Sequence, residues 1–307
     1  MRAAIASLCL VLAAAGVARA EGPPTAACAG RDMDTAIAAC SRLIGAGHAV
    51  TGPLAADIYD DRGVACAAKD RLDEAIADFS QAIILDPIDS TALRNRGDAY
   101  ARQQRWAEAM ADYDRALALR PDYAQAANGR AIAEASLKRL NDAVADLSRA
   151  IALSPKDPLA WSNRGQAYEQ LHRHDLAVAD FNQALALDPN LANTLIARGL
   201  GYKHARKMDL AIADFTQAIA VDRQSAVAYN DRGSTYDFVG RFDLAVADFD
   251  RAIALQPDYA KAYANRGNTR MNKGEKEKAI ADFRKALALQ PGERLAVAGL
   301  KAFGLQP

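Results

Sequence analysis

PLAWSNRGQAYEQLHRHDLAVADFNQALALDPNL, residues 158–191, is one copy of a 34-residue pattern that recurs along the chain. The copies begin near Ala56, Ser90, Ala124, Pro158, Ala192, Ala226 and Ala260. Proline closes six of them, and Arg223 stands at that position in the fifth copy. A fixed period of this length is typical of repeat proteins, in which each unit buries its apolar face against its neighbours.

Each copy contains two apolar-periodic stretches of about 12 to 14 residues, which are ordinary helix lengths. A short polar turn such as Lys69-Asp70-Arg71 separates them. The first stretch carries glycine at its eighth position in most copies, and the second carries alanine at positions 20 and 27. Small residues at these places let neighbouring helices approach closely, and the chain is poor in the β-branched runs that mark strands. The pattern therefore predicts an all-α fold of stacked helix pairs.

The motif resembles the tetratricopeptide repeat (TPR) signature, W-x2-L-G-x2-Y followed by A-x3-F, A and P. The fourth copy matches best, with Trp161, Gly165, Tyr168, Ala177, Phe181, Ala184 and Pro189. The resemblance extends from about Asp34 to the C-terminus. It implies an all-α, right-handed α-α superhelix (a TPR solenoid) that carries a partner in a concave groove.

The first 20 residues differ from the rest. Met1-Arg2 is a short positive start, residues 3–17 are apolar, and Ala18-Arg19-Ala20 is a small-x-small cleavage pattern. These features predict a cleaved secretory signal peptide, with an uncleaved anchor as the alternative. The apolar run is too short to span a bilayer comfortably. Together with the resemblance to exported TPR proteins of Gram-negative bacteria, this predicts a periplasmic or secreted protein.

The expected organisation has four parts: residues 1–20 as the signal peptide, 21–55 as an extension with a half-repeat helix, 56–291 as seven repeats, and 292–307 as a capping helix. The half-repeat resembles a second TPR helix, with Cys40 at the aromatic position. Cys28 lies twelve residues before it, and a disulfide between the two would stabilise an end that lacks its partner helix. Cys66 is either a buried thiol or a second possible partner for Cys40.

Two charged residues recur in all seven copies, Arg at position seven and Asp at position 23, as in Arg62 and Asp78. In an antiparallel helix pair these positions lie near each other. We predict an Arg–Asp ladder that joins helices through bidentate ion pairs. The alternative is a charged stripe that binds a partner.

Charge and motifs exclude several classes of function. Lys plus Arg equals Asp plus Glu at 38 each, and removal of the signal peptide would leave 36 against 38, a net charge of −2. This balance offers no basic surface for nucleic acid or anionic lipid. No nucleophile elbow or phosphate loop is present, so we expect no enzyme activity and no cofactor. His172 and His174 lie on a turn without a third ligand nearby in the sequence, so no metal site is expected.

The resemblance implies that the concave groove is lined by positions 2, 5, 9, 12 and 13 of the first helix in each repeat. The groove candidates are Asn128, Ile132, Leu159, Gln166, Glu169, Ile196, Leu200, Lys203, Val227, Asn230 and Phe238. Phe238 is of the type that anchors interfaces; the alternative is that such residues pack against the next helix. The Lys/Asn/Arg carboxylate clamp of some TPR domains is absent, because positions 5 and 9 carry pairs such as Asp60 and Val64.

The third copy departs from the others. It has Glu134 and Leu147 at positions where aromatic residues are usual, and Ala131 where glycine is usual. This is either neutral drift or a soft joint in the superhelix.

The function predicted from these features is a non-catalytic protein–protein interaction scaffold of the bacterial cell envelope that binds a peptide or protein in the groove. The alternatives are a structural or oligomerisation module and a regulatory subunit of an envelope enzyme.

Overall fold

The structure is a computed structural model that describes residues 28, 32–45 and 52–306, so the predicted signal peptide lies outside the described residues. Every regular element in these ranges is an α-helix, which confirms the all-α fold class. The helices are α1 (Met33–Gly45), α2 (Pro53–Ala68), α3 (Leu72–Leu85), α4 (Ser90–Arg102), α5 (Trp106–Leu119), α6 (Ala124–Ser136), α7 (Leu140–Leu153), α8 (Pro158–Gln170), α9 (His174–Leu187), α10 (Ala192–His204), α11 (Met208–Val221), α12 (Ala226–Phe238), α13 (Phe242–Leu255), α14 (Ala260–Asn272), α15 (Lys276–Leu289) and α16 (Arg294–Ala302).

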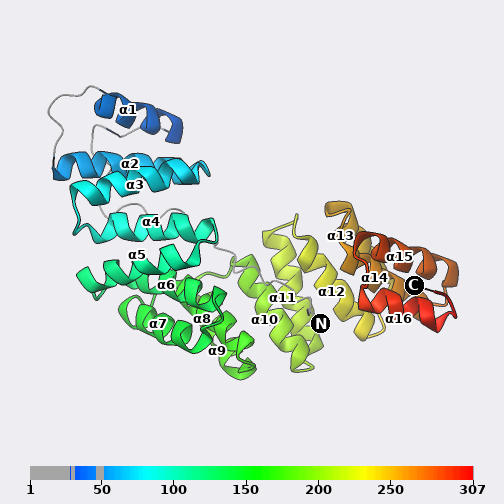
Figure 1. Cartoon of the computed structure of the whole chain (residues 1–307). Helices are drawn as coiled ribbons and strands as arrows, with labels where there is room; N and C mark the ends of the chain where they lie inside the picture. Colours follow the sequence, from blue (N-terminus) through cyan, green and yellow to red (C-terminus); the bar gives the residue numbers. More distant parts are fainter. Residues whose placement is uncertain (1–27, 29–31, 46–51, 307) are drawn as a thin grey trace. The chain divides into compact units, whose positions relative to one another are not determined.

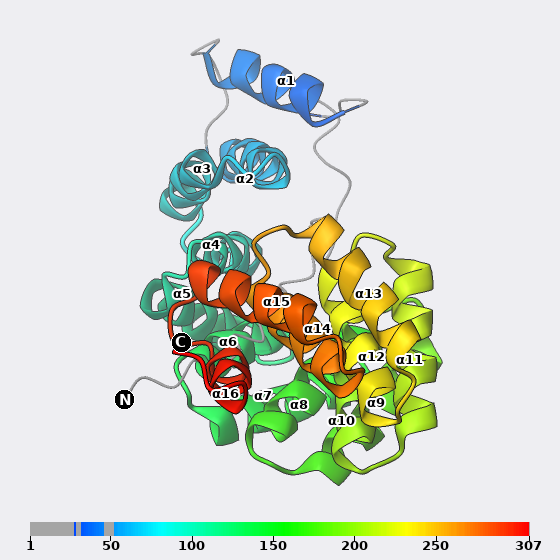
Figure 2. The same cartoon turned by 90° about the vertical axis from the view of Figure 1, so that its right-hand side faces the viewer.

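The chain divides after Leu171 into two compact units, the first with α1 to α8 and the second with α9 to α16. In the first unit, α2 to α8 follow one another as stacked neighbours, and α1 packs on α2 (Figure 1). In the second unit, α10 to α15 stack in the same way, and α16 packs on α14 and α15 (Figure 2). Each unit is thus built from helix pairs that contact the pairs beside them.

Six of the even-numbered helices begin at the residue where the sequence places a repeat start, from Ser90 for α4 to Ala260 for α14. Helix α2 begins at Pro53, three residues before the predicted start at Ala56. Proline is well suited to the first turn of a helix, because the backbone N–H that it lacks would have no partner within the helix there. Asp89, Asp157 and Ser225 cap α4, α8 and α12 by accepting a backbone N–H.

An aromatic ring buried against a glycine holds the two helices of a repeat together. In the fifth repeat Phe215 is buried, and a Cβ added to Gly199 would lie only 2.7 Å from the ring. The same arrangement recurs in the first, second, sixth and seventh repeats. The third repeat has Ala131 at the position of the glycine and Leu147 at the position of the aromatic residue. These two residues pack in one cluster. A smaller side chain therefore makes room for the alanine methyl group, so these two departures compensate each other.

The turn between the two helices of each repeat contains one residue in the left-handed region. These residues are Asp70, Gln104, Lys138, His172, Arg206, Gly240 and Gly274, with φ between 59° and 77°. This conformation ends a helix by allowing a backbone N–H beyond it to reach back to an earlier carbonyl. Arg71 N–H, for example, donates to Cys66 O at 2.9 Å.

No helix in the described part of the chain is both long and apolar enough to cross a membrane.

Candidate functional site

The candidate surface is the face of the first helix of each repeat that bears the predicted groove residues, and it is described separately in each unit. In the first unit Ile132 and Gln166 are buried, while Leu159 and Glu169 are half-buried. Asn128 is half-buried, and its Oδ1 accepts a hydrogen bond from Asn163 Nδ2 at 3.0 Å. In this unit the predicted residues thus lie mainly between neighbouring helices.

In the second unit the predicted residues range from buried to exposed. Ile196 is buried in a hydrophobic cluster between α10 and α11, and Leu200 packs against that cluster. Asn230 is 0% exposed, so its side chain does not line the surface, contrary to the prediction. Val227 and Phe238 retain 44% and 53% of their accessible surface. The exposed apolar part of this face therefore lies on α12.

Polar groups surround the exposed residues of α12. Lys203 Nζ on α10 donates to Ser234 Oγ on α12 at 2.5 Å. Burial lowers the pKa of Lys203, against the opposing attraction of Asp231. The guanidinium carbon of Arg206 lies 4.9 Å from the centre of the Phe238 ring, within cation–π range. This contact orients Phe238 while leaving much of its ring accessible.

Hydrogen bonds link successive first helices along this face, and the sequence interpretation missed them. Asn95 Nδ2 donates to both carboxyl oxygens of Asp60 at 3.0 and 3.1 Å, and Asn265 Nδ2 donates to Asn230 Oδ1 at 2.9 Å. Like the Asn163–Asn128 bond, each joins residues 35 apart, that is, position five of one repeat to position six of the next. Two of the predicted groove residues, Asn128 and Asn230, are therefore already hydrogen-bonded to the next repeat.

Asp60 and Asp231 are buried carboxyl groups within these contacts. Burial raises the pKa of Asp60 from 3.8 to about 7, although the Asn95 hydrogen bonds oppose the rise. Burial also raises the pKa of Asp231, which accepts a hydrogen bond from Asn230 Nδ2 at 3.0 Å. Desolvation penalises the ionised form of each carboxyl group.

The predicted Arg–Asp ladder is present in the six repeats that lie within one unit. In each of them Nε and Nη2 of the arginine donate to the two carboxylate oxygens of the aspartate sixteen residues later. The remaining nitrogen, Nη1, donates to the second helix of the preceding repeat, as Arg96 does to Ser80 at 3.0 Å. The aspartates are buried, which favours the structural role over a binding stripe. The fourth pair, Arg164 and Asp180, has one member in each unit.

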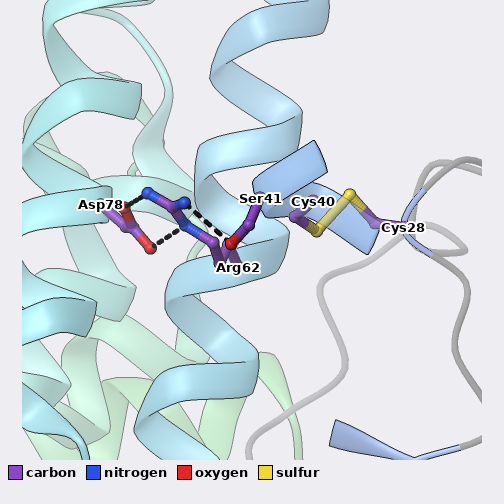
Figure 3. Close-up of a disulfide and its surroundings, with 5 residues drawn as sticks. All are labelled: Cys28, Cys40, Ser41, Arg62 and Asp78. Atoms are coloured by element: carbon purple, nitrogen blue, oxygen red, sulfur yellow. Dashed lines mark hydrogen bonds and ion pairs between the residues drawn. A yellow bond between two sulfur atoms is a disulfide. The ribbon is translucent and has the colours of Figure 1, made fainter. Parts of the chain in front are cut away.

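A disulfide joins Cys28 to Cys40 on α1, with 5.1 Å between the Cα atoms (Figure 3). Beside it, Arg62 bridges Asp78 to Ser41, which follows Cys40 on α1. Both cysteines are buried with Ile58 in a cluster at the α1–α2 contact. Cys66 is a free, buried cysteine, and burial raises the pKa of its thiol. The half-repeat helix is thus fixed both covalently and by the first ladder arginine.

The histidines lie closer together than their sequence spacing indicated. The ring of His204 on α10 lies 5.5 Å from that of His174 on α9, and His172 lies 6.0 Å from His174. His204 is distant from the H-x-H pattern in the sequence, and the packing of adjacent repeats brings its ring beside that of His174.

Comparisons with known proteins identify the repeat. Family models described as tetratricopeptide repeat match residues 25–90, 68–124, 158–191 and 260–293, and one described as TPR repeat matches residues 133–172 and 240–274. No curated protein matches the chain significantly.

Among solved structures, a chain of the APC/C hetero-tetramer Cut9-Hcn1 matches with a TM-score of 0.70 and 17% identity, covering 88% of this chain and 52% of that chain. This protein thus spans about half the length of that relative. A tetratricopeptide repeat protein from Parabacteroides merdae matches with a TM-score of 0.60 and 22% identity, over 80% of this chain and 97% of that one.

YrrB, a TPR protein with an unusual peptide-binding site, matches with a TM-score of 0.53 and 23% identity, over 62% of this chain and 97% of that chain. At these identities the likeness concerns the fold alone. With the 34-residue period, the helix pairs and the family matches in agreement, the chain belongs to the tetratricopeptide-repeat family, whose fold serves as a scaffold for protein–protein interaction.

Proposed function

We propose that this protein is a non-catalytic scaffold that binds a peptide or a partner protein on the first-helix face of its repeats. The observation that carries the proposal is the exposure of Phe238, which keeps 53% of its surface on a face where most other predicted apolar residues are buried or half-buried. Large aromatic side chains held in place at a surface are the usual anchors of interfaces. Arg206 holds this ring in a cation–π contact and lowers the entropy that binding would cost.

The exposed residues of α12 define what such a partner would offer. Val227 and Phe238 are eleven residues apart on one helix, which places them on the same face about 16 Å apart. An extended peptide spans that distance with about five residues. The basic side chains of Lys203 and Arg206 lie beside the face. A partner segment that carries an acidic group between or next to two apolar side chains would therefore be complementary to this surface.

We also propose that the protein works in the periplasm or outside a Gram-negative cell. Two features support this location: the signal-like pattern of residues 1–20 and the disulfide between Cys28 and Cys40. Disulfides persist in oxidising compartments and are rare in the cytosol.

The test is affinity capture from envelope extract with identification by mass spectrometry, comparing the wild type with a Val227→Ser, Phe238→Ala double variant. Ile196 is left unchanged because it is buried, so a charge there would disturb the core. Leu244→Ala is the matched control, since Leu244 is exposed to 50% on α13, outside the proposed face. Circular dichroism verifies that all three proteins keep their helicity.

A partner retained by the wild type and the Leu244→Ala control but lost by the double variant supports the proposal, and binding of the two purified proteins then measures the affinity. If all proteins capture the same partner equally, the α12 face is not the binding site. If nothing is captured and sedimentation shows self-association, the structural or oligomerisation alternative replaces this one. Loss of an enzyme's regulation in a strain without the protein would favour the regulatory-subunit alternative.

A further inference from the structure

A hollow of about 300 Å³ opens to solvent between α5, α6 and α7 in the third-repeat region of the first unit. Met110 and Asp114 line it from α5, Glu134 from α6, and Asp142 and Asp146 from α7. Its volume is at the lower end of the range for small-ligand pockets. Glu134 is two residues from Ile132, and two helical residues differ by about 200° around the axis. The hollow therefore lies on the opposite side of α6 from the predicted groove.

Glu134 is the unusual group of this hollow. Its relative exposure is 4%, and its Oε1 lies 3.4 Å from Arg139 Nη2. The other oxygen, Oε2, is buried and has no hydrogen-bond partner among the described residues. A buried acceptor without a partner costs free energy, so it is a place where a donor from outside would bind favourably.

The other charges of the hollow already have partners. Arg130 donates to Asp114 at 2.7 Å and also forms the ladder pair with Asp146. Arg139 donates to Asp142 at 2.9 Å. Four carboxyl groups and two guanidinium groups line the space, so it has an excess of two negative charges when all are ionised. This excess favours a cationic ligand over an anionic one.

Comparison with the other repeats shows why the space exists. At the position of Glu134 the second, fourth, fifth and sixth repeats have tyrosine, as in Tyr168, whereas Glu134 is shorter and leaves that volume unfilled. The seventh repeat has Arg270 there, and its Nη1 donates to the ladder residue Asp282 at 2.8 Å. The chain itself thus places a basic side chain at the equivalent position of another repeat.

We propose that this hollow receives a lysine side chain of a partner protein, with its ammonium group on Glu134 Oε2 and its alkyl chain along Met110 and Ala145. Lysine fits better than arginine because Glu134 offers only one oxygen that has no hydrogen-bond partner. A guanidinium group binds best to two acceptors in a plane, whereas an ammonium group acts as a point charge on a flexible stem. This contact is independent of the groove proposed above.

The experiment titrates the full-length, ¹⁵N-labelled protein with Nα-acetyl-lysine methylamide and follows amide shifts by NMR. The norleucine analogue, which has no terminal ammonium group, is the matched ligand control. We expect shifts confined to α5, α6 and α7 with a dissociation constant on the order of 1 mM, as for a fragment-sized ligand. The norleucine analogue should cause no shifts there.

Three variants test the assignment to Glu134. Glu134→Gln keeps the shape and removes the charge, and should weaken binding about tenfold or more. Glu134→Tyr fills the hollow with the residue found at this position in the fourth repeat and should abolish binding. Glu277→Gln removes an exposed charge on α15, in the other unit, and should bind as the wild type does.

The proposal is overturned if the lysine and norleucine derivatives give equal shifts, if neither gives any, or if Glu134→Gln binds as tightly as the wild type. It is also overturned if the arginine derivative binds more tightly than the lysine derivative. Because Glu134→Gln is nearly isosteric and its fold can be verified from its own NMR spectrum, a misfolded Glu134→Tyr protein would not prevent this decision.

Discussion

Replacement of Asp60 by asparagine should change how the stability of the first unit depends on pH. Asp60 lies on α2 with 6% exposure, and its pKa is raised from 3.8 to about 7, chiefly by burial. The folded state therefore binds the proton more tightly than the unfolded state does. The contribution of Asp60 to the free energy of unfolding is greatest below pH 3.8, the pKa of an unfolded aspartate, and it falls as the pH rises to about 7.

The size of the effect follows from the two pKa values. A difference between 3.8 and about 7 corresponds to about 4 kcal/mol of lost stability once the group is fully ionised in both states. Between about pH 5 and pH 8 the expected loss is roughly 2 to 3 kcal/mol. Asp60→Asn cannot ionise, and its carbonyl oxygen can still accept from Asn95. The contribution of the substituted asparagine to the free energy of unfolding should therefore be the same at every pH.

The assay is urea unfolding followed by tryptophan fluorescence at several pH values. Both tryptophans of the chain, Trp106 and Trp161, lie in the first unit, so the signal reports the unit that contains Asp60. We expect Asp60→Asn to be more stable than the wild type at about pH 8 and to lose that advantage at about pH 5. Glu134, whose pKa is also raised to about 7, titrates equally in both proteins and cancels in the difference.

Asp73→Asn is the control, because it makes the same chemical change at an exposed carboxyl group of the same unit, on α3. The reasoning is refuted if the free-energy difference between wild type and Asp60→Asn stays constant from pH 5 to pH 8. A constant difference would mean that Asp60 ionises at its ordinary pKa despite its burial.

Three further perturbations test the packing. Arg232→Met leaves the buried Asp248 without its bidentate partner and should cost about 3 kcal/mol in urea unfolding of the second unit followed by circular dichroism. Gly199→Ala presses a methyl group against Phe215 and should cost about 1 to 3 kcal/mol, and adding Phe215→Leu should recover part of that loss. Cys40→Ser removes the disulfide and should lower the local stability of α1 by about 3 kcal/mol, read from faster amide hydrogen exchange.

Each of these has a control or a contrary outcome. Arg241→Met removes an exposed arginine in the same repeat as Arg232 and should be nearly neutral. Additive losses for the Gly199→Ala, Phe215→Leu pair would contradict the compensation inferred from Ala131 and Leu147. Unchanged exchange in α1 after loss of the disulfide would show that packing on α2 alone fixes this helix.

The sequence predicted those features that are repeated within every copy. Period, helix starts and the Arg–Asp pairs all follow from identities at fixed positions, since residues such as Arg232 and Asp248 keep the same spacing in each repeat. A spacing of sixteen across a short turn has only one geometry in an antiparallel pair, so the contact could be inferred without coordinates.

The candidate site was less predictable because its contacts depend on how one repeat stacks on the next. Asn128 and Asn163 are 35 residues apart, so they occupy different positions, five and six, in their two repeats. A pattern taken from a single repeat therefore does not reveal this contact. The burial of Ile196 and Asn230 depends likewise on the size of side chains in the neighbouring helices. Glu134 was visible as a departure from the aromatic pattern, but only the structure shows that its Oε2 is buried without a hydrogen-bond partner among the described residues.

The three-way bonding of the ladder arginines has a consequence for how such a chain changes length. Each of the six copies that lie within one unit carries both members of its own ion pair, and Nη1 donates to varied partners in the preceding copy: Ser80, Asp114, Asn182, Thr216 and Asp250. Duplication or deletion of a whole 34-residue cassette therefore leaves no buried aspartate without its arginine. The bonds that span 35 residues impose the opposite constraint, because they make particular copies depend on particular neighbours. Insertion or deletion of a copy would therefore leave a polar side chain without its partner where those bonds occur, and not where they are absent.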